Sequence, residues 1–206
     1  VDHFINGKSS SESNKTSKIY NPSYGTEIGE VLCATNELAD KAVESAYEAS
    51  KAWSKTGLIY RSELILKFRQ NVINRSKEII DLGISEAGKT RPDAEAELDR
   101  AVQALTHIAG VQHFYPSHYS QNVAGGIDIA DLRFPIGVIV GVGPFNFPIL
   151  IPLLHSAMAL VTGNTYIGKP SEKVPTVSRL YADIWKESGL PDGIVRELYK
   201  NYLDTN

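Results

Sequence analysis

The sequence Ile-Gly-Val-Ile-Val-Gly-Val at residues 136–142 decides the fold, because polar residues do not alternate with the apolar ones. Such a run is typical of a strand in a parallel sheet whose two faces are both covered by helices. A helix is predicted from about residue 148 to residue 162, followed by a second strand at residues 165–167. A strand, a helix and a strand in this order predict a βαβ unit with a right-handed crossover.

The residues after this unit continue the pattern. A further helix is predicted from about residue 174 to residue 188, and Gly189 ends it. The turn sequence Pro191-Asp192-Gly193 then leads into a third strand that begins at Ile194. The last third of the chain is therefore predicted as the first half of a doubly wound α/β sheet.

The residues before this unit are predicted to be mainly helical. Apolar residues recur every three or four positions after Asn36, which indicates an amphipathic helix that is capped by Thr35 or Asn36 and ends at Gly57. The same period continues over residues 64–82, and a third helix is predicted over 98–108.

Two segments are predicted as ribbons of strands. Residues 4–8 predict a hairpin with an Asn-Gly turn, which we interpret, with the polar run that follows it, as a surface ribbon. In residues 121–133, Gly125 and Gly126 separate short Val/Ile alternations, and Pro135 closes the segment. This exposed ribbon favours, as an alternative to an enzyme, a non-catalytic binding or subunit-interaction module that adds to a partner's sheet edge.

The composition excludes several classes of partner. Hydrophobic residues make up 42% of the 206 residues and charged residues 22%, as in a globular chain. The net charge is -3 and the basic residues do not cluster, so neither nucleic acid nor a membrane surface is an expected partner. The apolar stretch at 147–162 contains Pro148 and Pro152 and is shorter than the roughly 20 residues that span a bilayer.

Cysteine and histidine usage bounds the compartment and the metal chemistry. The single cysteine, Cys33, has no basic neighbour or helix start to activate it, and we interpret it as a packing or loop residue. A lone cysteine favours a reducing compartment, here the cytoplasm or the mitochondrial matrix. The five histidines show no metal-ligand spacing, so we expect no metal site.

The residues after the first strand, Gly143-Pro144-Phe145-Asn146-Phe147-Pro148, stand where open α/β sheets bind ligands. Asn146 occupies the place of the third glycine of a dinucleotide fingerprint, so we expect a pyrophosphate to be held elsewhere than at this turn. The two prolines stiffen the backbone around Asn146, and a fixed amide donor can stabilise a developing oxyanion. The alternative is an Asx turn that caps the next helix.

Two other places carry candidate chemistry. Lys169 and Glu172 end the second strand and are candidates to bind ribose hydroxyls, or else belong to an ordinary turn that opens the next helix. Arg100 lies on the third predicted helix, where we interpret it as a solvated ion pair with Glu97 and, second, as a contact for a substrate carboxylate. Glu95, Glu97 and Asp99 are interpreted as a solvated helix edge.

Four motifs in order resemble the N-terminal part of aldehyde dehydrogenases: Gly143–Pro148, Gly163–Thr165, Lys169–Glu172 and Gly189–Gly193. Phe145 in place of tryptophan, together with residues 4–8 and 169–175, is most similar to the methylmalonate-semialdehyde dehydrogenases. The resemblance implies an oxidation of a small aldehyde that uses NAD and acylates coenzyme A, in a homo-oligomer.

The resemblance also implies roles for residues. Asn146 is implied as the oxyanion donor, and Arg100 as the holder of the substrate carboxylate, although Ala101 follows it rather than glycine. A cofactor site is implied at Gly143, Pro144, Phe145, Lys169, Ser171, Glu172 and Lys173.

The chain departs from the family pattern in three respects. Gly168 replaces a bulky strand residue, the later glycine motif for the pyrophosphate is absent, and no nucleophilic cysteine or general-base glutamate follows. Residues 199–206 drift from the pattern as well. We therefore expect an incomplete Rossmann-like cofactor domain that is inactive as written, because the family reaction needs a thiolate nucleophile.

We divide the chain into three parts. Residues 1–120 are expected to form a ribbon and helices of the cofactor domain, residues 121–135 an exposed oligomerisation ribbon, and residues 136–206 the first half of the NAD-binding sheet. The catalytic domain is expected to be absent from these residues.

Overall fold

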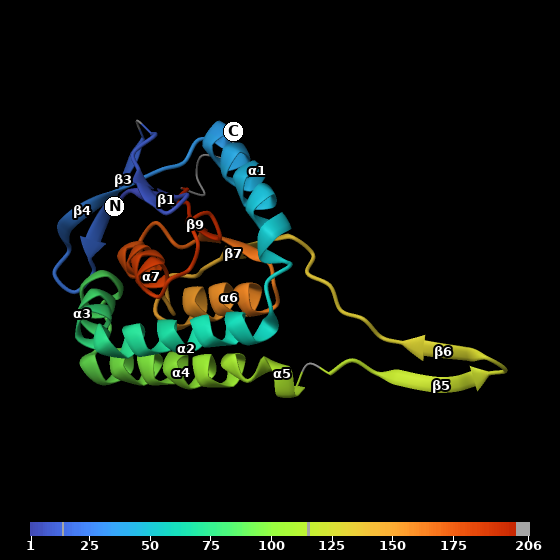
Figure 1. The fold of residues 1–206 in the computed structure, drawn as a ribbon. Helices are drawn as coiled ribbons and strands as arrows, with labels where there is room; N and C mark the ends of the chain where they lie inside the picture. The colour runs from blue at the N-terminus through green and yellow to red at the C-terminus, as the bar shows by residue number, and fades with distance from the viewer. Residues whose placement is uncertain (14, 115, 201–206) are drawn as a thin grey trace.

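The computed structural model describes residues 1–13, 15–114 and 116–200. Its main sheet has the order β2-β1-β9-β8-β7 (Figure 1). Three of the strands are parallel, namely β7 (Val138–Val142), β8 (Thr165–Lys169) and β9 (Val195–Glu197). The helices α6 (Leu150–Val161) and α7 (Thr176–Glu187) connect them in turn, which confirms the predicted βαβ organisation.

Helices cover both faces of the parallel strands, as the unbroken apolar pattern predicts. Successive side chains of a strand point to opposite faces. Tyr166 of β8 packs with the core that contains α6 and α7, whereas the next residue, Ile167, packs with buried residues of α1. Strand β8 is therefore buried on both faces, whereas β7, whose apolar run predicted this, leaves Val140 and Val142 more than half exposed.

Five helices lie between the N-terminal strands and the ribbon (Figure 1). They are α1 (Asn36–Trp53), α2 (Leu58–Asn74), α3 (Ser76–Ala87), α4 (Arg91–Ala109) and the short α5 (Val111–Phe114). Thr35 caps α1 as predicted, because its Oγ1 accepts from the Leu38 backbone N–H at 3.2 Å.

Two of the predicted helix boundaries are wrong. Helix α1 ends at Trp53, and Gly57 is the N-cap residue of α2 rather than the end of α1. The continuous period over residues 64–82 is divided between α2 and α3 at Arg75, whose guanidinium bridges Glu78 and Glu187 at 2.9 and 2.8 Å. The apolar period continues across Arg75, so the sequence pattern did not indicate that the helix breaks there.

The N-terminal hairpin has the predicted turn but not the predicted exposure. Strands β1 (His3–Ile5) and β2 (Lys8–Ser10) are joined at Asn6 and Gly7, both with positive φ. Strand β1 is not part of a surface ribbon, because it pairs antiparallel with β9 and buries His3 and Phe4. A second hairpin, β3 (Thr16–Asn21) with β4 (Thr26–Leu32), forms a separate sheet, and β4 was not predicted.

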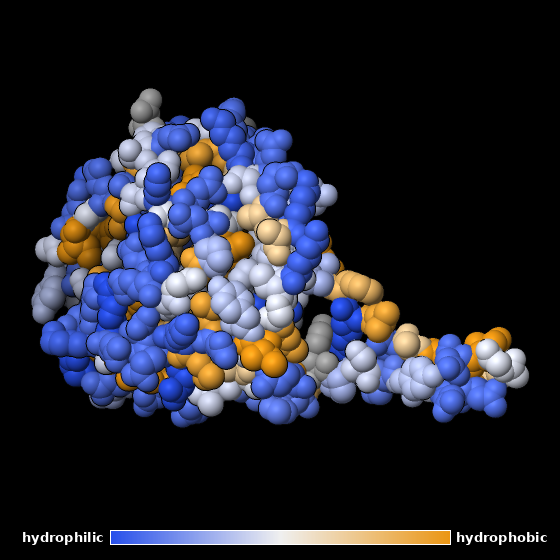
Figure 2. Space-filling model, viewed as in Figure 1, coloured by the Kyte–Doolittle hydropathy of each residue, from blue (hydrophilic) through white to orange (hydrophobic). Residues whose placement is uncertain are grey.

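The predicted exposed ribbon is confirmed. Strands β5 (Tyr119–Ala124) and β6 (Ile127–Ala130) form a hairpin in which every residue is exposed. The hairpin projects from the body on two long arms, and Figure 2 shows apolar residues among the polar ones along it. Among the described residues, no helix is both long enough and apolar enough to cross a membrane.

One core joins the N-terminal helices to the parallel sheet. Phe68 of α2 stacks on Trp185 of α7 with ring centroids 3.6 Å apart, and Trp53 of α1 donates its indole N–H to the Leu160 carbonyl of α6 at 3.2 Å. Helix α4 also packs on α6. The helices of the first half therefore hold the elements from which the strand-end loops emerge.

Candidate functional site

The loop from Gly143 to Pro148 leaves the carboxyl end of β7 and turns its middle residues toward solvent. Gly143 is buried, and its N–H donates to the Lys169 carbonyl at 3.0 Å, which ties this loop to the end of β8. Phe145, Asn146 and Phe147 are exposed. The loop therefore presents its side chains at the edge of the sheet where open α/β proteins bind ligands.

The amide of Asn146 is available for a ligand. Within the described residues its side chain makes no hydrogen bond, so it does not cap α6, and the alternative of a capping Asx turn does not hold. The N-cap position of α6 is Ile149, whose side chain is apolar. A side-chain amide that is exposed and unoccupied retains both of its donors.

Glu97 of α4 supplies the cap that Asn146 does not. Its Oε1 accepts hydrogen bonds from the backbone N–H groups of Ile149 and Leu150, both at 2.9 Å. Only 4% of Glu97 is exposed, and its Oε2 lies 3.1 Å from Lys89 Nζ. The interpretation of Glu97 as a solvated residue paired with Arg100 is therefore wrong.

The helical period contained the signal that identifies Glu97. Along α4 the buried positions are Ala94, Glu97, Leu98, Ala101 and Leu105, which places this glutamate on the apolar face of the helix. A charged residue on such a face needs a partner from another element. Arg100 is exposed and forms no ion pair among the described residues, so its proposed contact with a substrate remains a prediction.

A second buried glutamate caps the second crossover helix. Glu86 of α3 is 7% exposed, and it accepts from the backbone N–H of Thr176 at 3.1 Å and from the hydroxyl of the same residue. Burial raises the pKa of Glu86 above its ordinary value. Residues 171–172 do not open α7, which begins at Thr176.

The end of β8 carries the candidate ribose-binding residues. Lys169 Nζ and Glu172 Oε2 lie 3.6 Å apart, with side chains 14% and 16% exposed. Ser171 is buried, and its Oγ accepts from the Lys173 backbone N–H at 3.3 Å. The Lys173 ammonium lies 5.1 Å from the centre of the Phe145 ring, which joins this turn to the first loop.

The two loops line an open cavity of about 420 Å³. Its lining consists of Val142, Gly143, Pro144, Phe145, Ser171, Glu172 and Lys173. Six of these seven residues are predicted cofactor contacts. Lys169, the seventh predicted contact, does not line the cavity but lies beside Glu172, which does. The structure thus brings the predicted cofactor residues together, while Arg100 lies on α4.

The binding of a ribose at this cavity stays a prediction. Glu172 Oε2 is withdrawn from solvent and accepts no hydrogen bond from the described residues, so it has capacity for a ribose hydroxyl. The first amides of α6 are taken by Glu97, so a phosphate cannot use them. No group of three or more His, Cys, Asp or Glu side chains suited to a metal ion occurs in the described ranges.

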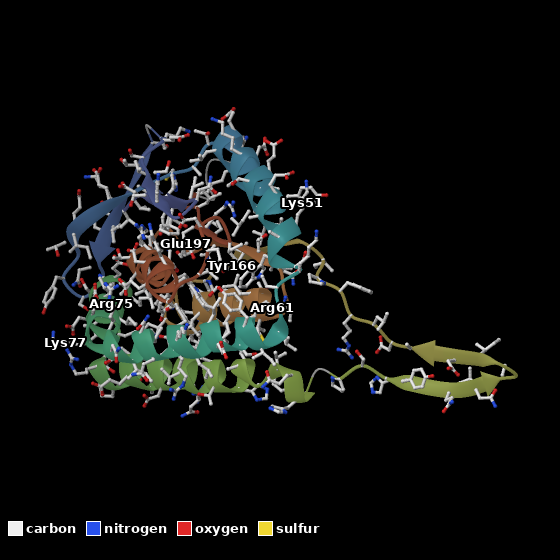
Figure 3. All side chains as sticks on the ribbon, viewed as in Figure 1. Lys51, Arg61, Arg75, Lys77, Tyr166 and Glu197 are labelled. Carbon is white, nitrogen blue, oxygen red and sulfur yellow. The ribbon has the colours of Figure 1, made fainter. Side chains whose placement is uncertain are left out.

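Gly168, a departure from the family pattern, has a physical reason in β8. A Cβ at this position would overlap the carboxylate of Glu197, its register partner in β9. Glu197 lies in the interior beside the sheet, as does Tyr166 (Figure 3). The absence of a side chain at residue 168 makes room for this buried acid.

Comparison with known proteins finds a family match and similar full-length proteins. The model of the aldehyde dehydrogenase family matches residues 9–202. A mouse protein named methylmalonate-semialdehyde/malonate-semialdehyde dehydrogenase [acylating], mitochondrial, is 37% identical over all of this chain and 39% of its own length. A malonate-semialdehyde dehydrogenase of Lacticaseibacillus casei is 36% identical over 95% of this chain and 40% of its own.

Solved structures show the same relationship. A crystal structure of methylmalonate-semialdehyde dehydrogenase from Oceanimonas doudoroffii superposes with a TM-score of 0.95 at 31% identity, over 98% of this chain and 41% of that one. A Sinorhizobium meliloti protein complexed with NAD superposes with a TM-score of 0.94 at 34% identity, again over 41% of its length. This chain spans about two fifths of the length of these relatives. The family model covers nearly the whole chain, and the chain belongs to the aldehyde dehydrogenase family.

Proposed function

We propose that this chain forms the cofactor-binding side and the oxyanion donor of an NAD-dependent, coenzyme A-acylating dehydrogenase of malonate or methylmalonate semialdehyde. The observation that carries the proposal is the Asn146 amide, which is exposed and makes no hydrogen bond within the described residues, beside the cavity at the ends of β7 and β8. The names of the relatives support the substrate class, and one relative was solved with NAD.

Each residue of the site has a chemical task in this proposal. When a thiolate adds to an aldehyde, negative charge develops on the carbonyl oxygen, and the Asn146 Nδ2–H donates to that oxygen. Glu172 accepts a hydrogen bond from one ribose hydroxyl, and Lys169 donates a hydrogen bond to a ribose hydroxyl. The residues that line the cofactor site are Gly143, Pro144, Phe145, Ser171 and Lys173. NAD supplies the hydride acceptor. The exposed guanidinium of Arg100 pairs with the carboxylate of the semialdehyde.

The nucleophilic thiol comes from outside these 206 residues. Their single cysteine, Cys33, is buried in the segment between β4 and α1. A buried thiol in apolar surroundings ionises poorly and does not serve as a nucleophile. We propose that the thiol belongs to the part of the relatives that this chain does not span, and that the complete enzyme is a homo-oligomer of the cytoplasm or the mitochondrial matrix.

The test joins this chain to the remaining part of the Lacticaseibacillus casei relative. We expect the chimera to reduce NAD with malonate semialdehyde and coenzyme A, and the 206-residue chain alone to give no NADH. Asn146→Ala in the chimera should lower kcat by about 10²–10³, the loss measured for one oxyanion donor. Turnover by the chain alone, or an unchanged kcat in the Asn146 variant, would refute the proposal.

The ribbon favours a second candidate function. Val123, Ile127 and Ile129 are exposed on a hairpin that, among the described strands, pairs with none of the body. Exposed strands of this kind add to the sheet edge of a partner chain. Under this alternative the chain is a non-catalytic subunit-interaction module that co-elutes with a full-length relative, and the loop at 143–148 has no chemical task.

A further inference from the structure

We infer that Glu97 is a positioning residue for Asn146, acting through the first turn of α6 and through Lys89 and Phe147. The inference rests on the proposed function, because it concerns the geometry of the proposed oxyanion donor. The residues involved come from α3, α4, α6, α7, the segment between α3 and α4, and the loop between β7 and α6.

The first step is the hydrogen bonding of α6. The first turn of a helix leaves backbone N–H groups without a partner in the helix, and their direction is fixed only when an acceptor is supplied. Glu97 Oε1 accepts from both Ile149 N and Leu150 N at 2.9 Å. One carboxylate oxygen on a neighbouring helix thus sets the direction in which the loop enters α6.

The second step is the immobilisation of Ile149. Its carbonyl accepts from the hydroxyl of Tyr181 in α7 at 2.9 Å, and its side chain is fully buried. The side chain packs so closely on Gly83 of α3 that a Cβ there would come within 2.9 Å of Ile149 Cδ1. Ile149 is therefore held by α3, α4 and α7, three residues after Asn146.

The third step links the same carboxylate to the residue next to Asn146. Lys89 Nζ lies 3.1 Å from Glu97 Oε2 and 5.2 Å from the centre of the Phe147 ring. The side chains of Lys89 and Glu97 are 16% and 3% exposed, so water screens their ion pair only weakly, whereas the Phe147 ring that Lys89 faces is 43% exposed. The ammonium balances the buried charge and attracts the ring of Phe147, which leaves Asn146 little freedom at its C-terminal side.

The matched variants separate the hydrogen bonds from the charge. Glu97→Ala removes both, whereas Glu97→Gln keeps an acceptor oxygen for Ile149 and Leu150. Lys89→Met keeps the cap and removes the ammonium from Phe147. Glu95→Ala is the control, because Glu95 lies on the same helix with a side chain that is 51% exposed.

The first readout is NMR of the 206-residue chain labelled with ¹⁵N. We expect Glu97→Ala to shift or broaden the side-chain amide signal of Asn146 and to speed hydrogen exchange at Ile149 and Leu150 by about tenfold or more, as for a lost helix cap. Glu97→Gln should restore slow exchange, Lys89→Met should move only the Asn146 signal, and Glu95→Ala should change neither. An Asn146 signal that stays in place in Glu97→Ala overturns the inference.

A second readout uses the active chimera. Misplacing a reacting group by about 1 Å costs up to roughly a hundredfold in rate. We therefore expect Glu97→Ala to lower kcat by about tenfold to a hundredfold with the KM for NAD unchanged, and Glu97→Gln to recover most of it. A loss that appears in KM alone overturns the inference.

The two hypotheses fail in different ways. If Asn146→Ala leaves kcat unchanged, the proposed function fails, whatever the NMR spectra of Glu97→Ala show. If Asn146→Ala lowers kcat and Glu97→Ala moves neither the Asn146 signal nor kcat, only the positioning role fails. If Glu97→Ala does not fold, the inference is tested with Lys89→Met instead. An Asn146 side-chain signal that stays in place in that variant overturns the inference.

Discussion

Glu197 is a carboxylic acid enclosed in the interior at the end of β9, 3% exposed. Burial raises its pKa well above the usual 4.5, and the nearby charge of Arg179 in α7 opposes this only in part. Burial also raises the pKa values of Tyr166 and Tyr199, and the charge of the nearby Glu197 adds to both shifts. The folded chain therefore favours the neutral acid, and the unfolded chain releases the proton at a lower pH.

This asymmetry makes stability depend on pH. The contribution of Glu197 to the free energy of unfolding is fully present below about pH 4.5 and is lost as the pH rises through the folded pKa. Glu197→Gln should raise the free energy of unfolding at neutral pH by about 1–3 kcal/mol and flatten its pH dependence. Guanidinium unfolding followed by tryptophan fluorescence at several pH values measures both.

The control for this experiment is Glu44→Gln, which changes an exposed glutamate of α1. We expect it to leave the pH dependence as in the unaltered chain. The same slope in Glu197→Gln and in the unaltered chain would show that another group sets the pH dependence.

The sequence predicted where Asn146 lies but not which residue holds the helix turn that follows it. The flanking prolines and the strand end predicted an exposed amide, yet the competing cap could be dismissed only when Glu97 was seen to hold the first turn of α6. Local sequence does not show which helix approaches another. The partner of a buried glutamate was therefore beyond prediction, although the helical period placed Glu97 on the apolar face.

At the scale of elements, α6 and α7 are capped in the same manner by glutamates of the preceding helices. Glu97 of α4 accepts from α6, and Glu86 of α3 accepts from α7. Neither crossover helix has a side-chain cap of its own, since their N-cap residues are Ile149 and Pro175. The N-terminal helices thus supply hydrogen-bond acceptors to the crossover helices as well as apolar contacts.

Removal of the second cap tests this arrangement. Glu86→Ala should lower the free energy of unfolding by about 1–2 kcal/mol, as for the loss of an N-cap, because Thr176 N–H keeps no acceptor. Hydrogen exchange should accelerate at the first turn of α7 and not in the middle of α2. Asp99→Ala, an exposed change on α4, is the matched control. Unchanged exchange at Thr176 in Glu86→Ala would contradict the cap.

Element types followed from the sequence better than element boundaries. The unbroken apolar runs predicted β7 and β8, and the glycine pair predicted the turn of the ribbon. The break at Arg75 was invisible, because α2 and α3 keep one apolar period while the guanidinium of Arg75 bridges both sides of the junction. Strand β4 was missed since its residues are mostly exposed and carry little apolar pattern.

At the scale of the molecule, β7 lies at one end of the main sheet and pairs only with β8 among the described strands. Val140 and Val142 of β7 are 56% and 51% exposed. An unpaired edge and exposed apolar residues favour association between chains. The described residues of the parts predicted as 1–120 and 136–206 meanwhile share one core and one sheet, and residues 201–206 lie outside the described residues.

Lysine substitutions at exposed apolar residues can show through which surface the 206-residue chain associates. We expect its sedimentation coefficient to rise with concentration and Val140→Lys, at the sheet edge, to suppress the rise. Ile127→Lys tests the ribbon, and Val43→Lys on α1 is the matched control because Val43 is also exposed. Suppression by Ile127→Lys alone would favour the subunit-interaction function, and a monomer at every concentration would contradict the expectation.

The pairing of β1 with β9 has a consequence for the order of assembly. Asn6, in the hairpin turn, accepts a hydrogen bond from Arg196, 190 positions further along the chain. Bringing such distant segments together must pay the entropy of closing a very long loop. During synthesis the hairpin emerges before β9, so it can complete its native pairing only after β9 has been made.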